Sequence, residues 1–131
     1  MKKFLSLGII SISLFFVSCE GNTNRAYHVA NQSSETVKVY VNHNYYGTID
    51  TFEINANSTS QILEYDQRGG SDNTENLGNL FTELIIVNSQ QDTCLKSHII
   101  DENWSILVDE KNRVPSEWEH DYTFSISDLD F

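Results

Sequence analysis

The chain has little positive charge. Its 131 residues include 8 Lys and Arg against 19 Asp and Glu, which gives a formal net charge of −11 at pH 7. No stripe of Lys and Arg is available to meet a phosphate backbone, so the sequence excludes a nucleic-acid-binding protein. An acidic surface keeps a protein soluble and also attracts a cationic partner.

Cysteine, proline and long apolar runs are also scarce. The chain has two cysteines, Cys19 and Cys94, and one proline, Pro115. Its one long apolar run, residues 4–17, is shorter than the ~20 residues that a membrane-spanning helix needs. The sequence therefore predicts an exported chain that no helix embeds in the bilayer.

Residues 1–18 have the pattern of a signal peptide. Lys2 and Lys3 form a short positive start, residues 4–17 are apolar, and polar residues begin at Glu20. Removing residues 1–18 takes away two lysines and no acid, so the formal net charge of the remaining chain is −13.

Cys19 follows Phe16-Val17-Ser18, which puts a small residue only directly before the cysteine. This arrangement resembles the lipobox of bacterial lipoproteins, in a relaxed form with apolar residues at both preceding positions. The resemblance implies that a peptidase removes residues 1–18 and that Cys19 then carries lipid, which holds a chain stably at a membrane when two or more acyl chains are present. The alternative is an apolar N-terminal helix with Cys19 in the core. With Cys19 lipidated, Cys94 has no partner for an intramolecular disulfide.

Apolar residues recur with a period of two along most of the remaining chain, which indicates β-strands. Val37, Val39 and Val41 alternate with polar residues, and residues 122–126 repeat the pattern. The expected strands are residues 27–31, 36–42, 49–54, 61–66, 84–87, 93–100, 104–108 and 122–126. Seven or eight short strands separated by turn clusters predict an all-β fold, an antiparallel sandwich or barrel.

The expected domain covers residues 27–131, after a lipidated N-terminus and short linker at residues 19–26. Two connections are expected to be long loops: residues 67–79, rich in Gly and Asn, and residues 112–121, which contain the proline. Long loops on a rigid β scaffold are frequent binding sites.

The leader ending in Cys19, the opening segment YHVANQSSETVKVYV and the final segment YTFSISDLDF are similar to small lipoproteins of Bacteroides-type bacteria. The resemblance covers the leader, the opening hairpin and the closing strand. It implies an immunoglobulin-like β-sandwich of the cell envelope, anchored by lipid at the outer membrane, on its surface or its periplasmic face. It implies no catalytic residue.

Residues that could carry chemistry are few and scattered. The four histidines are His28, His43, His98 and His120. They lack the spacing of a zinc site, and we expect them to be surface or half-buried residues. Residues 101–105, DENWS, begin like a calcium loop that lacks its later glycine and glutamate. Cys94 and His98 would share one face of a strand ~13 Å apart, too far for a thiol and imidazole pair. The sequence therefore predicts no metal, no cofactor and no enzyme.

Three aromatic residues stand in polar surroundings. Tyr45 and Tyr46 precede a glycine, and Trp118 lies in the segment SEWEHD. Exposed Trp and Tyr residues stack on sugars or anchor protein partners, so these three are candidate binding residues. Alternatively, Trp118 closes one end of the sandwich and the two tyrosines extend a strand. Trp104, in an alternating apolar stripe, is assigned to the core.

These patterns favour a non-catalytic envelope lipoprotein, which meets the membrane through its lipid and binds a protein or glycan. An envelope inhibitor or immunity protein that binds a basic enzyme or toxin is the alternative reading of the negative charge. An enzyme is the least favoured class.

Replacing Cys19 with alanine should leave an unprocessed precursor that incorporates no radioactive palmitate, because the thiol that carries the lipid is gone. Labelling of cells that express the chain, followed by immunoprecipitation, measures this. The variant Cys94→Ala is the matched control and should be labelled normally. Full labelling of the Cys19→Ala variant would contradict the lipid assignment.

Overall fold

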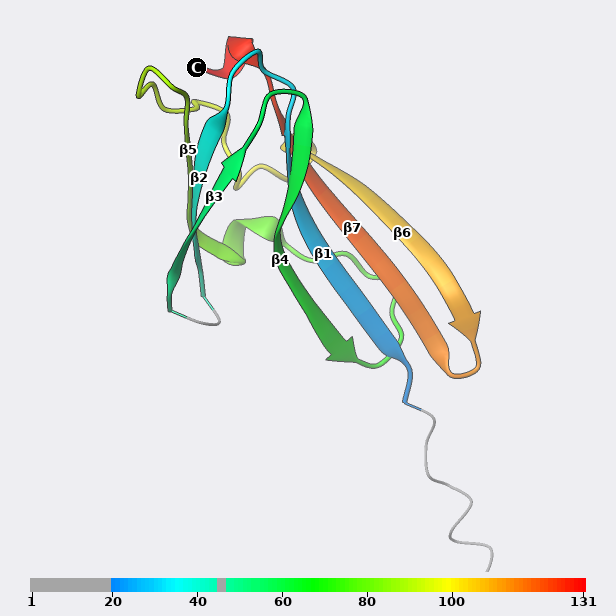
Figure 1. The fold of residues 1–131 in the computed structure, drawn as a ribbon. Helices are drawn as coiled ribbons and strands as arrows, with labels where there is room; N and C mark the ends of the chain where they lie inside the picture. Colours follow the sequence, from blue (N-terminus) through cyan, green and yellow to red (C-terminus); the bar gives the residue numbers. More distant parts are fainter. Residues whose placement is uncertain (1–19, 45–46) are drawn as a thin grey trace, which may run out of the picture.

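The computed structural model describes residues 20–44 and 47–131, so the expected signal peptide, Cys19, Tyr45 and Tyr46 lie outside the described residues. The described part contains seven strands and three short 3-10 helices (Figure 1). The strands are β1 (Asn22–Asn31), β2 (Val37–His43), β3 (Ile49–Ile54), β4 (Ser58–Arg68), β5 (Phe81–Val87), β6 (Trp104–Arg113) and β7 (Ser116–Ile126). The helices are η1 (Leu77–Asn79), η2 (Asp101–Asn103) and η3 (Asp128–Asp130). Within these residues, no helix has the length and apolar character needed to cross a membrane.

The strands form two sheets, which confirms the all-β expectation. The four-stranded sheet has the order β4-β1-β7-β6, and the three-stranded sheet has the order β3-β2-β5. Neighbouring strands are antiparallel except β1 and β7, which run parallel. A purely antiparallel sandwich was therefore the wrong expectation for this pair. The β6–β7 hairpin leaves β7 running in the direction of β1, so the last strand joins the first in a parallel ladder.

One apolar core fills the space between the two sheets, and aromatic rings connect them. Tyr27 stacks on Tyr122 with ring centroids 4.6 Å apart. Phe81 of β5 stacks on Trp104 of β6 at 5.9 Å, so this ring pair joins the two sheets. Trp104 is buried, which confirms its assignment to the core. Such ring pairs each add about 0.5–1.5 kcal/mol beyond the area that they bury.

The first strand begins five residues earlier than the sequence predicts, at Asn22 rather than Tyr27. Of the expected linker, only Glu20 and Gly21 among the described residues lie ahead of the strand. The alternation is hidden in the sequence because the inward positions are held by Thr23 and Arg25, which are polar yet buried.

The expected loop at residues 112–121 is also wrong. β6 and β7 form a long hairpin that turns at Val114 and Pro115. The outward positions of β7 carry Glu117, Glu119 and Asp121, and these charges gave the segment the composition of a loop.

The strand expected at residues 93–100 is absent, since this segment forms only one bridge, between Thr93 and Val87. The segment crosses from the three-stranded to the four-stranded sheet. Its backbone forms hydrogen bonds to β5 and to η3, which follows β7. Cys94 N donates to Ile86 O at 2.8 Å, and Leu95 N donates to Asp130 O at 2.7 Å. No continuous ladder can form on such a crossing.

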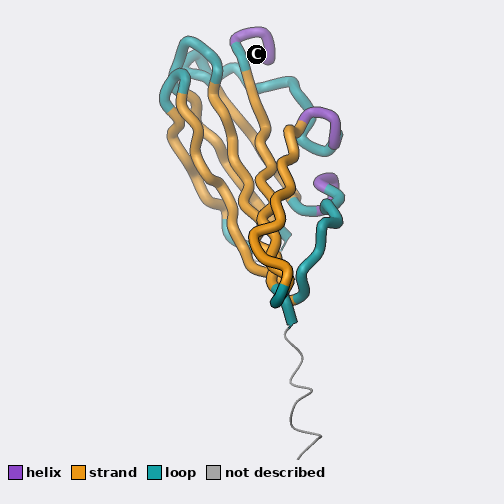
Figure 2. The backbone as a smooth tube through the Cα atoms, turned by 90° about the vertical axis from the view of Figure 1, so that its right-hand side faces the viewer, coloured by secondary structure: helices purple, strands orange, loops and turns teal. Residues whose placement is uncertain are grey.

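The two sheets differ in length. Strands of the four-stranded sheet have 10 or 11 residues, against 6 or 7 in the three-stranded sheet. The longer sheet extends beyond the shorter one at the end where β1 begins, and the C-terminus lies at the opposite end (Figure 1). Figure 2 shows the same two ends from the side, with the 3-10 helices as short turns. We call the end formed by Gly21, Arg68 and the Val114-Pro115 turn the N-terminal end of the sandwich.

At this end Gly21 lies in close contact with the β6–β7 hairpin. Gly69 N donates to Gly21 O at 2.7 Å. A Cβ atom built on Gly21 would lie 1.8 Å from Ser116 O, which is too close for two non-bonded atoms. Only glycine fits, and the packed fold therefore begins two residues after Cys19.

The Gly21→Ala substitution should lower the free energy of unfolding by about 1–3 kcal/mol, because the added methyl group forces the strand end away from Ser116. Denaturant unfolding of the purified protein measures it. Asn22→Ala is the control, since this exposed side chain bonds only to Asp66 and its loss should cost no more than about 0.5 kcal/mol. Equal stability of the Gly21→Ala variant and the unchanged chain would contradict the close packing.

Candidate functional site

The loop of residues 69–76 covers the inner face of the four-stranded sheet where the other sheet does not reach. A covering loop brings backbone polar groups that need partners, because burying them unpaired costs free energy. Thr23 supplies two such bonds, as its hydroxyl donates to Gly69 O at 2.8 Å and accepts from Ser71 N at 3.0 Å. The polar residues of β1 and β7 thus fasten the loop.

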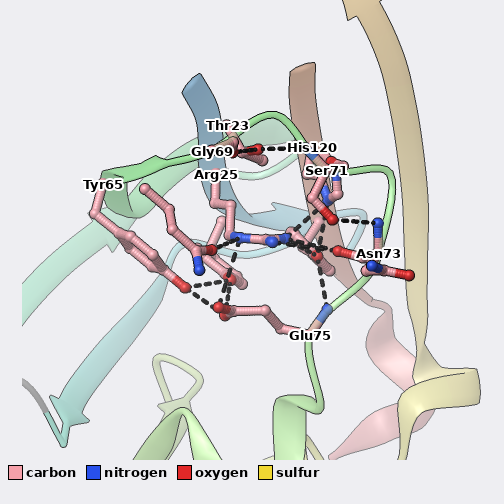
Figure 3. Close-up of polar contacts among 11 residues, drawn as sticks. Thr23, Arg25, Tyr65, Gly69, Ser71, Asn73, Glu75 and His120 are labelled. Carbon is pink, nitrogen blue, oxygen red and sulfur yellow. Dashed lines mark hydrogen bonds and ion pairs between the residues drawn. The ribbon is translucent and has the colours of Figure 1, made fainter. Parts of the chain in front are cut away.

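Arg25 is the centre of this contact and is only 3% exposed. Both of its Nη atoms donate to Asn73 O, each at 3.2 Å, which fixes the middle of the loop (Figure 3). Nη1 also donates to Tyr122 OH at 3.0 Å. Its Nε lies 3.5 Å from a carboxylate oxygen of Glu75, which compensates the buried positive charge.

His120 is fully buried beside Arg25, and its bonds define its tautomer. Arg25 Nη1 lies 2.8 Å from Nδ1, and a guanidinium can only donate, so Nδ1 accepts and carries no proton. Nε2 then carries the proton and donates to Ser71 O at 2.8 Å. Burial, together with the charge of Arg25, lowers the pKa of His120, although the Ser71 carbonyl opposes this change. The imidazole is therefore neutral at pH 7.

Glu75 joins the loop to two tyrosines. Its Oε2 accepts from Tyr27 OH at 2.7 Å and from Tyr65 OH, and its backbone N donates to Tyr122 OH at 3.0 Å. Burial, with the hydrogen bonds to Tyr65 and Glu75, raises the pKa of Tyr27 far above its ordinary value. Burial and the bond to Glu75 likewise raise the pKa of Tyr65. Both hydroxyls therefore remain donors, and the carboxylate is held in one orientation.

A cavity of about 430 Å³ opens beside this carboxylate. It is lined by Asn44, Glu75, Asn76, Asn79 and Leu80. Asn44 follows the end of β2, and its side chain is fixed because it donates to Asn79 O and accepts from Thr82 Oγ1. Asn76 caps η1, since its Oδ1 accepts from Gly78 N at 3.0 Å. We call this cavity the Glu75 pocket; its lining can donate to and accept from a polar ligand.

Of the three aromatic candidates, the structure describes only Trp118. It is half-buried on β7 near the N-terminal end, opposite Thr23 of β1, and its Nε1 donates to Ser116 Oγ at 2.9 Å. Trp118 does not line the Glu75 pocket. Tyr45 and Tyr46 follow Asn44 in the sequence and lie outside the described residues.

Two of the histidines differ from the expectation of surface or half-buried residues, because His43 and His120 are buried. In residues 20–44 and 47–131 no three His, Cys, Asp or Glu side chains are grouped so as to hold a metal ion. Burial raises the pKa of the Cys94 thiol, which keeps it protonated at pH 7. Asp101, which starts the calcium-like segment, accepts from Leu77 N at 3.3 Å and so supports η1.

Sequence reasoning missed Arg25, Glu75 and the role of His120. A signal was present: Thr23, Arg25 and Tyr27 alternate, as do His120, Tyr122 and Phe124, so each set shares one strand face. The polar members suggested a linker and a loop because the sequence does not show that a loop, rather than a sheet, covers this face.

Comparisons with protein-family models, with curated proteins and with solved structures found no match to this chain.

The unfolding free energy should fall as the pH drops from about 6.5 towards 5. The folded pKa of His120 lies below its ordinary 6.5, so in this interval the unfolded chain binds the proton first and is favoured. Thermal unfolding between pH 5 and 7.5 measures the slope. The His120→Gln variant keeps a donor for Ser71 O and should show a shallower slope; the remainder belongs to His98, whose pKa burial also lowers. An unchanged slope in this variant would contradict the role of His120.

Proposed function

We propose that the chain is a non-catalytic lipoprotein of the cell envelope, an immunoglobulin-like β-sandwich that lipid on Cys19 anchors at the outer membrane and that binds a protein or glycan. The observation that supports it best is the position of the first strand. β1 begins at Asn22 and Gly21 is packed against Ser116, so a lipid on Cys19 would hold the N-terminal end of the sandwich directly at the membrane. The opposite end, with the β1–β2 and β3–β4 turns, would then face outward.

The number of strands and their division between the sheets support the immunoglobulin-like part of the proposal, whereas the strand orders β4-β1-β7-β6 and β3-β2-β5 differ from the A-B-E-D and C-F-G orders of constant-type domains. Constant-type immunoglobulin domains have seven strands divided four and three between two sheets, which is the division found here. The parallel pairing of β1 with β7 is a departure from an all-antiparallel arrangement.

The bonding of three titratable groups, the buried Arg25 and His120 and the half-buried Glu75, supports a binding rather than a catalytic role. Arg25, His120 and Glu75 all bond to backbone or side-chain groups of the fold, and these bonds hold a loop in place. Such partners make the three groups structural, and they support the walls of the Glu75 pocket.

One observation favours the alternative, an envelope inhibitor or immunity protein for a basic enzyme or toxin. On the outer face of the four-stranded sheet, the register places Asp66, Asn24, Glu119 and Asp109 in one row across the four strands. Lys111 bonds to Asp109 at 2.7 Å and to Glu119 at 2.8 Å, so part of this charge is already compensated. The row would steer a cationic partner by long-range attraction.

Protease shaving of intact cells should digest the domain if it is displayed on the outer surface, where a protein or glycan ligand would be met. Opened cells are the control for protease access, and a periplasmic marker reports on envelope integrity. Protection until the envelope is opened would favour the inhibitor or immunity alternative. Recovery of the protein in the soluble fraction, without the membranes, would contradict the lipid anchor and with it the proposed function.

A further inference from the structure

The Glu75 pocket has the size of a small-molecule site. Its volume of about 430 Å³ lies within the range of roughly 300–1,000 Å³ found for ligand pockets. The loop that forms one wall is fixed by Arg25 and His120, and Asn44 is held by bonds to Asn79 O and Thr82. A ligand would therefore meet walls that are already ordered, which limits the entropy lost on binding.

The charges around the pocket exclude an anionic ligand. Among the described lining residues Glu75 alone is charged, and its side chain is 24% exposed. Arg25 lies behind it with a side chain only 4% exposed, so its charge is turned towards the carboxylate rather than towards the cavity. A phosphate or carboxylate ligand would face Glu75 with no cation to receive it.

Several hydrogen-bonding groups of the pocket remain available. Glu75 has about four lone-pair sites; Tyr27 and Tyr65 donate to Oε2, while Oε1 faces Arg25 Nε at 3.5 Å as an ion pair and keeps room for a further donor. Asn76 uses its Oδ1 to cap η1, and among the described residues its Nδ2 has no hydrogen-bond partner. The side-chain amide of Asn79 likewise bonds to no other described residue. The pocket thus offers the amide donors of Asn76, which is held by its capping bond, and of Asn79, together with a few acceptors.

Leu80 is the one apolar residue among the described lining residues, and only 4% of it is exposed, so little of its side chain reaches the cavity. A peptide ligand would need apolar depressions for its side chains, and the lining residues that the structure describes are one apolar and four polar. A sugar ring suits it better, because its hydroxyls can both donate to and accept from the amides and the carboxylate of the lining.

We propose that the Glu75 pocket binds a neutral sugar unit of a glycan, with Asn76 and Asn79 donating to its oxygens and Glu75 accepting from a hydroxyl. This inference rests on the proposed binding function and names its ligand class. Recognition depends on amide donors, so replacing them weakens binding without disturbing the fold.

The test is a calorimetric or NMR titration of the full lipidated chain, in micelles of a detergent that has no sugar headgroup. The probes are glucose, galactose, mannose and N-acetylglucosamine, with glucuronic acid as the anionic probe. At least one neutral sugar should bind with a millimolar or tighter dissociation constant, and glucuronic acid should bind more weakly than glucose.

Two variants locate the site. Asn76→Asp keeps the oxygen that caps η1 but removes both N–H donors beside Glu75, so the affinity should fall about tenfold. Asn79→Ala removes a side-chain amide that bonds to no other described residue, and the affinity of this variant for the sugar should fall severalfold. Asn112→Asp is the matched control in the β6–β7 hairpin, where the side-chain oxygen also accepts from a backbone N, and its affinity should be unchanged.

The inference is overturned if no neutral sugar binds, if glucuronic acid binds more tightly than glucose, or if neither Asn76→Asp nor Asn79→Ala changes the affinity. Palmitate labelling of Cys19 distinguishes failure of this inference from failure of the proposed function. Palmitate labelling of Cys19 without sugar binding would overturn only the ligand class. Sugar binding that depends on Asn76, without palmitate labelling of Cys19, would support the pocket assignment and overturn only the lipid anchor.

Discussion

The structure depends on the buried guanidinium of Arg25. Where the three-stranded sheet ends, the inner face of the longer sheet would meet water, and the loop of residues 69–76 covers it instead. That loop can lie there only if its backbone groups find partners, and Arg25 binds the carbonyl of Asn73 from both Nη atoms. The charge is tolerated in the interior because Glu75 lies 3.5 Å away and His120 is neutral.

The same interaction links the core to the pocket. Glu75 is held on one side by Arg25 and by the hydroxyls of Tyr27 and Tyr65, and on its open side it lines a cavity with three asparagines. Tyr27 is also part of the aromatic stack that joins the sheets. The position of the pocket carboxylate is therefore coupled to the packing of the core, and a binding site formed in this way is rigid before a ligand arrives.

The unequal sheets also divide the molecule into two ends with different environments. At the N-terminal end the chain enters through a glycine with no room for a side chain, next to the β6–β7 turn. The outer face of the four-stranded sheet carries rows of carboxylates, and asparagines separate and bind them: Asn24 Nδ2 donates to Glu64 at 3.0 Å and to Asp66 at 3.1 Å. Hydrogen bonds from Asn24 and Asn22 lower the pKa of Asp66. The two amides thus favour the ionised form of Asp66.

The sequence alone determined the fold class and most of the strands. Strict alternation at Val37, Val39 and Val41 matched β2 closely, because this strand is apolar inside and polar outside, and the expected span of residues 49–54 matched β3. It also determined the loop after β4, whose glycines and asparagines end regular structure. Only the tertiary structure decided which polar residues face inward. Arg25, His120 and Glu75 come from three distant segments, and the burial of Arg25 and His120 depends on one sheet being longer than the other. The local sequence pattern does not show how long each sheet is. The sequence therefore placed Arg25 in a linker and His120 in a loop.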